Sequence, residues 1–116
     1  MAIDISTWEI GNEATAPGAG TVLVAKTLKS GYRGHIYGFL LSAEEANQFR
    51  INWTSQGVAR SKKIDFSGAG TISEEMKEHL NKGLEADAGT TITITNITAA
   101  VAGKIYQASL FFMEVR

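Results

Sequence analysis

Hydrophobic and polar residues alternate with a period of two along much of this chain. One stretch reads TITIT, which puts Ile92 and Ile94 on one face of a strand and the threonines on the other. Both residue types are β-branched and suit a pleated sheet. Phe49, Ile51 and Trp53 alternate with polar residues in the same way. We therefore expect two half-buried strands whose five apolar side chains lie in a common core.

Turn residues separate further stretches of this kind, and we expect seven to eight strands in all. Glycine inside a strand often marks a bulge, as at Gly38. Short strands at short intervals are typical of an antiparallel β-sandwich, so the expected class is all-β. Besides the strand through Phe49 and the TITIT strand, which spans Thr90–Thr98, the expected strands include a first strand through Ile3 and Ile5, then Thr21–Lys29, Tyr32–Ser42, Val58–Ser67 and Lys104–Arg116.

Alternation also assigns the faces of two early strands. In the expected strand Thr21–Lys29 it places Val22, Val24 and Leu28 on one face. In the next strand it places Tyr37, Phe39 and Leu41 on one face and Ile36 and Leu40 on the other.

The last strand is predicted to be apolar on both faces. Ile105, Phe111, Met113 and Val115 share one face, and Tyr106, Ala108, Leu110 and Phe112 share the other. A sandwich strand with one wet face needs only one apolar face, so the second face is expected to meet the N-terminal strand or a neighbouring subunit. The expected subunit-interface residues are Ile3, Ile5, Trp8, Tyr106, Leu110 and Phe112.

The N-terminal segment is predicted to stand apart from the body. Asn12–Gly20 reads NEATAPGAG and contains the single proline, which is typical of a flexible loop. We therefore divide the chain into residues 1–19, an N-terminal strand and linker that can act as an inter-subunit arm, and residues 20–116, the β-sandwich domain.

Thr71–Lys82 departs from the strand pattern. Ile72, Met76 and Leu80 recur every four residues, Thr71 with Glu74 forms a capping box, and Gly83 follows at the position of a helix cap. The spacing predicts one short amphipathic helix inserted between strands.

The charge and the cysteine content of the chain argue against several classes of binding partner and site. The formal net charge is −1, which argues against a strong grip on nucleic acid and against a polybasic membrane-binding surface. The chain has no cysteine, so disulfides and thiolate chemistry are excluded. It has no apolar run of about 18 residues, and its N-terminus lacks the basic region of a signal peptide.

No arrangement of residues points to a reaction. His79 follows Glu75 by four residues, but a pair lacks the third ligand of a metal site. Glu74 with Glu75 and Glu85 with Asp87 occupy helix-start and turn positions where acidic residues are structural. Nucleophile and phosphate-loop motifs are absent. We expect no catalytic, cofactor-binding or metal-binding residue and no enzymatic activity.

Two tryptophans leave a binding role open. Trp8 and Trp53 could form a sugar-stacking platform, although Trp53 alternates in phase with Phe49 and Ile51 and so fits the core better. Trp8 is the better candidate for a partner contact.

Three stretches resemble a known class of proteins. They are AGTVLVAKTLKSGYRGHIYGFLLSAEEANQFRINW, GLEADAGTTITITN and AAVAGKIYQASLFFMEV, which together cover most of residues 20–115. They resemble small β-sandwich structural proteins encoded among the virion genes of tailed phages and related viruses. The resemblance rests on turn glycines and strand pattern, and the helix and the N-terminal extension are departures from it.

The resemblance implies a jelly-roll-like sandwich that works by assembling. The expected function is a non-enzymatic virion structural protein, a capsid decoration, fibre or tail component, located in the virion. Its expected partners are copies of itself, a trimer being one such homo-oligomer, and other virion proteins. The alternatives are a carbohydrate-binding or adhesin-like module with a glycan partner, and a structural protein of a cell-surface layer or appendage.

Overall fold

The computed structural model describes residues 5–75 and 85–116, and the side chains of residues 11–73 and 85–116. The described residues form strands and no helix, which confirms the all-β class. The strands number nine rather than seven to eight. They are β1 (Ile5–Thr15), β2 (Val22–Thr27), β3 (Arg33–Ala43), β4 (Asn47–Ser55), β5 (Val58–Phe66), β6 (Gly70–Glu75), β7 (Glu85–Ala86), β8 (Thr91–Asn96) and β9 (Ile105–Val115).

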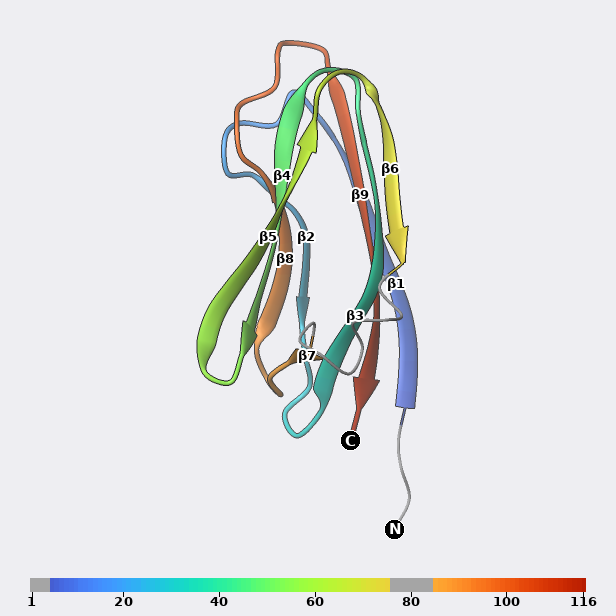
Figure 1. The fold of residues 1–116 in the computed structure, drawn as a ribbon, viewed down its shortest axis with the longest axis vertical. Coiled ribbons are helices and arrows are strands. Elements are labelled where there is room, and N and C mark those ends of the chain that lie inside the picture. The colour runs from blue at the N-terminus through green and yellow to red at the C-terminus, as the bar shows by residue number, and fades with distance from the viewer. Residues whose placement is uncertain (1–4, 76–84) are drawn as a thin grey trace.

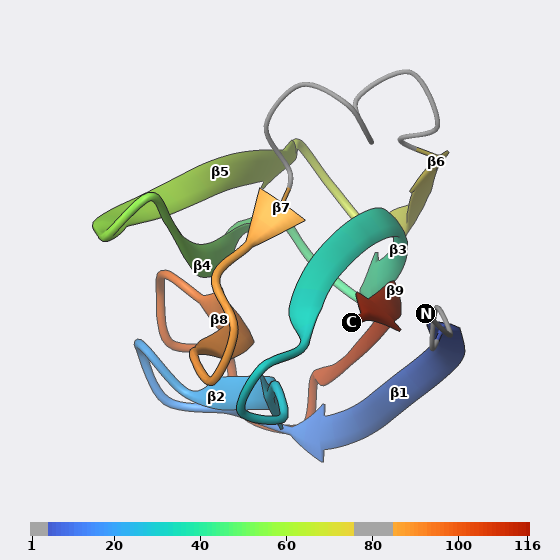
Figure 2. The same ribbon diagram turned by 90° about the horizontal axis from the view of Figure 1, so that it is seen from below.

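The strands form two antiparallel sheets that face each other (Figures 1 and 2). One has the order β1-β9-β3-β6, with the short β7 also paired to β3, and the other has the order β2-β8-β4-β5. The pairing is nested: β1 pairs with β9, β2 with β8, β3 with β6 and β4 with β5. A long hairpin wrapped over itself in this way has the strand arrangement of a jelly roll.

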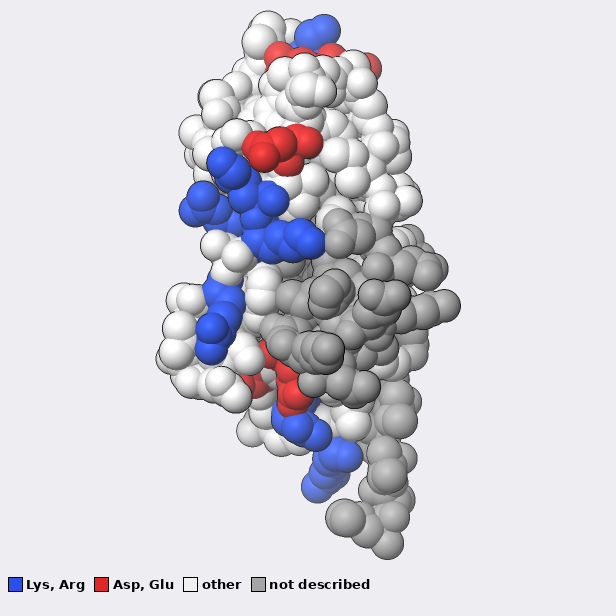
Figure 3. Space-filling view, in the orientation of Figure 1, with Lys and Arg blue, Asp and Glu red and all other residues white. Residues whose placement is uncertain are grey.

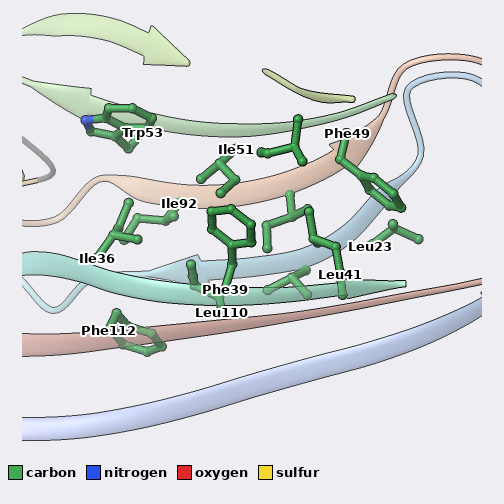
Figure 4. Packing of buried hydrophobic residues seen from close by; sticks show 14 of the residues in the cluster. Leu23, Ile36, Phe39, Leu41, Phe49, Ile51, Trp53, Ile92, Leu110 and Phe112 are labelled. Atoms are coloured by element: carbon green, nitrogen blue, oxygen red, sulfur yellow. The ribbon is translucent and has the colours of Figure 1, made fainter. Parts of the chain in front are cut away.

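The core lies between the two sheets. Phe49, Ile92 and Ile94 are fully buried, and Ile51 and Trp53 are 1% and 7% exposed, so the five predicted core residues are confirmed. Figure 4 shows side chains of β3 and β9 pointing toward those of β4 and β8. The Phe49 ring lies edge-on to that of Phe66, with 5.3 Å between centroids, a separation that aromatic pairs favour.

The predicted helix over Thr71–Lys82 is wrong for its first five residues. Thr71–Glu75 belongs to β6, which pairs with β3 so that Ile72 lies opposite Leu41. Ile72 packs against the core from this strand. Thr71 and Ile72 are β-branched, and β3 offers them a hydrogen-bonding edge that the local pattern could not reveal. Residues 76–82 lie outside the described part of the chain.

Two bulges shift the predicted faces. Between Ile36 and Gly38 the register with β9 slips, as expected near Gly38, so Ile36 joins Phe39 and Leu41 inside and Tyr37 moves to the outer face. A second irregularity between Val22 and Val24 leaves Val22 51% exposed. The predicted faces of these strands are therefore wrong on one side of each bulge, because an extra residue reverses the alternation.

The predicted linker begins as a strand. β1 continues through Asn12–Thr15, and every residue from Ile5 to Thr15 has a partner on β9. The alternation of apolar and polar residues in this segment is weak. The segment forms a strand because it pairs with β9, which is distant in the sequence. The turn that connects β1 to β2 is confined to residues 16–21.

Candidate functional site

The outer face of the β1-β9-β3-β6 sheet is the candidate functional surface. Tyr106, Ala108, Leu110 and Phe112 share one face of β9, as alternation predicted, and this face is buried inside the sandwich. Because successive side chains of a strand point to opposite faces, the intervening residues of β9 point outward. They are Ile105, Gln107, Ser109, Phe111, Met113 and Val115.

One half of this face is apolar. Tyr37 and Phe111 lie side by side, with 6.1 Å between ring centroids and 31° between ring planes. Both rings and Met113 are partly exposed, and Leu40, which is 40% exposed, lies opposite Ser109 at the border with the polar half. No described element covers these side chains from outside (Figure 2). The sequence assigned Phe111 and Met113 to this face, but it missed Tyr37 because the bulge reverses the phase of β3.

The other half of the face is polar and hollowed. Gly11 lies opposite Ser109 in the register, and Ser42 Oγ donates a hydrogen bond of 3.1 Å to Gln107 Oε1. Gln107 Nε2 in turn donates one of 2.8 Å to Glu13 Oε2. Small side chains leave a shallow hollow of about 380 Å³, lined by Gly11, Asn12, Leu40, Ser42, Thr71, Gln107 and Ser109. Such a surface is suited to contact rather than to bond-making chemistry.

The predicted interface residues fall in different places. Tyr106, Leu110 and Phe112 are at most 1% exposed and lie in the core of this chain. The backbones of Ile5 and Trp8 lie in β1 opposite Val115 and Phe112. Ile3 lies outside the described residues. A contact between subunits through these six residues stays a prediction, and the burial of three of them leaves the opposite face of β9 available to a partner.

A polar network closes the end of the sandwich drawn at the top of Figure 1. Asn47 Nδ2 donates to the Tyr106 hydroxyl and, at 2.8 Å, to the Thr98 carbonyl. The Tyr106 hydroxyl donates to Glu45 Oε2 at 2.9 Å, and the same oxygen accepts from the Val101 amide. Burial raises the pKa of Tyr106, the Asn47 hydrogen bond lowers it, and Glu45 raises it further. The network holds the loop before β9 against the turn before β4.

The opposite end is held by Asp87, which had been expected only to form a turn. Its Oδ1 accepts from the Gln56 amide at 2.9 Å and its Oδ2 from the Gly57 amide at 2.8 Å. Gln56 and Gly57 both have positive φ, 55° and 73°, as a two-residue hairpin turn requires. Asp87 therefore fixes the tip of the β4–β5 hairpin.

This contact predicts a pH effect. The two amide hydrogen bonds lower the pKa of Asp87 below its ordinary value, because they favour the charged carboxylate. Its contribution to stability is present above the pKa of the unfolded chain and is lost as the pH falls through the lower folded pKa. We expect Asp87→Asn to lower the melting temperature at pH 7, and to lower it progressively less as the pH falls through the lowered pKa of Asp87.

Thermal melts of both proteins between pH 7 and pH 2 measure this difference. Asp65→Asn is the matched control, because the Asp65 carboxylate accepts no hydrogen bond from the described residues. A melting difference for Asp87→Asn that stays constant down to pH 2 would contradict the assignment.

The other acidic candidates have structural partners or lie outside the description. Glu85 Oε1 pairs with Arg33 Nη1 at 2.6 Å. The side chains of Glu74 and Glu75 and all of His79 lie outside the described residues. Within residues 5–75 and 85–116, no three His, Cys, Asp or Glu side chains are placed to hold a metal ion. The described residues contain no helix with the length and apolar character needed to cross a membrane.

The predicted sugar platform of Trp8 and Trp53 lacks one member. Trp53 is 7% exposed and packs in the core, so its ring face is not available to stack on a sugar. The Trp8 side chain lies outside the described side chains.

No protein-family model matches the sequence, and no curated protein matches it. Among solved structures, one from Bacillus endospore appendages that form disulfide-linked pili is 12% identical, with a TM-score of 0.49 over 97% of this chain and 89% of the other. TmCBM61 in complex with β-1,4-galactotriose is 17% identical, with a TM-score of 0.43 over 94% of this chain and 63% of the other. The infectious bursal disease virus Gx strain structure is 10% identical, with a TM-score of 0.43 over 99% of this chain and 33% of the other. At such values the similarity concerns β architecture alone.

Proposed function

We propose that this protein is a non-enzymatic structural protein that assembles with copies of itself, as a capsid-decorating, fibre or tail component of a virion. The observation that carries the proposal is the apolar half of the outer β1-β9-β3-β6 face. Tyr37, Leu40, Phe111 and Met113 present apolar surface there. Exposed apolar patches of this kind are typical of protein–protein contacts.

The contrast between the two outer faces supports this proposal. On the other sheet, Thr91, Thr93 and Thr95 point outward, and Asn52 Nδ2 donates to Thr93 Oγ1 at 3.1 Å. β4 and β8 present polar side chains on that face, and the exposed Val22 lies at its β2 edge. A sandwich wetted on both sides has no need of one apolar outer face, so the apolar one is the face that a neighbouring copy covers.

The size of the face suits an interface. Three strands of about 36 Å and the shorter β6 of about 20 Å, at about 4.8 Å spacing, make a surface of about 600 Å². A standard protein–protein interface buries about 800 Å² on each partner. Burying the apolar half of such a face contributes several kcal/mol, at about 25 cal/mol per Å².

The N-terminal strand offers a second contact between copies. β1 pairs with β9 over residues 5–15, and the same register can form between two copies if β1 is exchanged. Residues 16–21 would then be the hinge. Exchange of an identical element is a low-cost route to an oligomer, and it is the form in which the predicted arm would act through Ile3, Ile5 and Trp8.

We expect Leu40→Asp to weaken assembly by tenfold or more in the dissociation constant. The change removes an exposed leucine, worth about 1.5 kcal/mol of burial, and places a charge in the contact. Light scattering coupled to gel filtration over a range of concentrations measures the change in mass.

Thr93→Asp is the matched control, because it adds the same charge to the outer face of the other sheet and should leave the mass unchanged. A wild-type protein that stays monomeric at high concentration, with no partner present, would overturn the proposal. So would equal effects of the two variants.

A further inference from the structure

Two basic side chains face each other in the middle of the β2-β8-β4-β5 sheet. Arg50 on β4 lies opposite Lys63 on β5, and both are exposed on the outer face. Figure 3 shows Lys and Arg side chains gathered over this hairpin. Neither residue has an ion pair with a described carboxylate, whereas Arg33 pairs with Glu85 and Lys26 with Glu114.

Such a pair is unfavourable by itself. Like charges directly opposite each other in a sheet destabilise it, and the chain as a whole has a net charge of −1. Lysine on an exposed edge strand protects against pairing with other chains, which accounts for Lys63 on β5. It does not account for Arg50, because β4 is flanked on both sides, by β5 and β8.

The surroundings of the pair are rich in neutral hydrogen-bonding groups. Thr95 lies beside Arg50 on β8, and Asn52 Nδ2 reaches the hydroxyls of Thr93 and Thr95. A shallow hollow of about 250 Å³ lies toward the hairpin turn, lined in part by Asn52, Thr54, Ser61 and Thr91. The face therefore combines hydroxyl and amide groups with two cations that form no ion pair with a described carboxylate, and one carboxylate, that of Asp65, lies beside Lys63 on β5.

We propose that this face binds an acidic polysaccharide. Arg50 and Lys63 together bind one sulfate or carboxylate group, and the threonines and Asn52 bind hydroxyl groups of the neighbouring sugars. Charge-assisted hydrogen bonds from both cations to one anion relieve their mutual repulsion. This binding does not depend on how copies of the chain assemble, since assembly uses the opposite outer face.

Nucleic acid fits this surface less well. Phosphate backbones are held by many cations at once, and single strands also stack on aromatic side chains. On the described part of this face, Arg50 and Lys63 are the opposed cations and Arg60 lines the hollow, while the Trp53 ring that also lines it is only 7% exposed. An acidic polysaccharide has neutral hydroxyl groups between its anionic groups, which suits a face that combines cations with threonine hydroxyls and an asparagine amide.

The test compares binding of the full chain to immobilised heparin, to neutral dextran and to a single-stranded DNA oligonucleotide. We expect heparin to bind and dextran not to bind. Arg50→Ser with Lys63→Ser should weaken heparin binding about tenfold, since both cationic contacts to the anion are lost. Its melting temperature should not fall, because a repulsive pair has been removed.

Lys29→Ser with Lys104→Ser is the charge-matched control and should change heparin binding less than twofold, a bound set by the weakness of distant exposed charges in salt. If the Arg50/Lys63 variant melts lower than the wild type, Lys63→Ser alone should still show a selective loss. Absence of heparin binding overturns the proposal. Equal losses in the two double variants overturn it too, as does DNA binding as tight as heparin binding.

Discussion

Ile94→Ala is expected to lower the free energy of unfolding by about 2–5 kcal/mol, the usual cost of emptying a well-packed aliphatic site. Ile94 is fully buried and lies opposite Val24 on β2 and Ile51 on β4. Both neighbours are held by their own ladders, so the cavity cannot easily collapse. Urea denaturation followed by tryptophan fluorescence measures the loss.

Thr93→Ala is the matched control, one residue away on the same strand. Thr93 points to the outer face, where its hydroxyl accepts a hydrogen bond from a partly exposed Asn52. Thr93→Ala should lower the free energy of unfolding by less than about 1 kcal/mol, as is usual for surface positions. Equal losses at the two positions would show that β8 does not have one buried and one wet face.

Local alternation was a sufficient guide where a strand is regular. β4 and β8 keep strict period two, and their buried faces were predicted correctly from the sequence, including Phe49 and Ile92. In these strands the inward residues are apolar except for Asn47 and Asn96 at the strand ends, and their period matches the pleat. In such a strand the sequence pattern identifies the buried residues without knowledge of which strands pair with it.

Where a strand is irregular, local alternation was not sufficient. The bulge at Ile36–Gly38 exchanges the faces of β3, and the sequence marks it only by Gly38. β6 carries a capping box and an apolar residue at Ile72 that suits a helix as well as a strand. The choice there is made by the edge of β3, a partner about 30 residues away.

The candidate surface shows the same limit. The sequence correctly found that β9 is apolar on both faces, but it could not say which face the second sheet covers. It therefore assigned Tyr106 and Phe112 to a contact between subunits, although these side chains fill the core. Phe111 and Met113 were placed on the opposite face, and only the two-sheet topology turns that face outward.

Asn47→Ala is expected to lower the free energy of unfolding by about 2–4 kcal/mol, because buried polar groups lose their partners. Asn47 is 8% exposed, and its Oδ1 accepts from the amides of Gln48, at 2.7 Å, and Thr98, at 3.2 Å. Its Nδ2 donates to Thr98 and Tyr106. Alanine leaves two amides without this acceptor and cannot replace the donor.

Asn52→Ala is the control, since it makes the same chemical change on the same strand. Asn52 is partly exposed on the outer face, where water can replace its hydrogen bonds, so its loss should be below about 1 kcal/mol. Amide exchange adds a local measurement: the Thr98 amide should exchange faster in Asn47→Ala and stay unchanged in Asn52→Ala. If Thr98 remains protected while global stability falls, Asn47 acts through packing rather than by holding the loop that leads into β9.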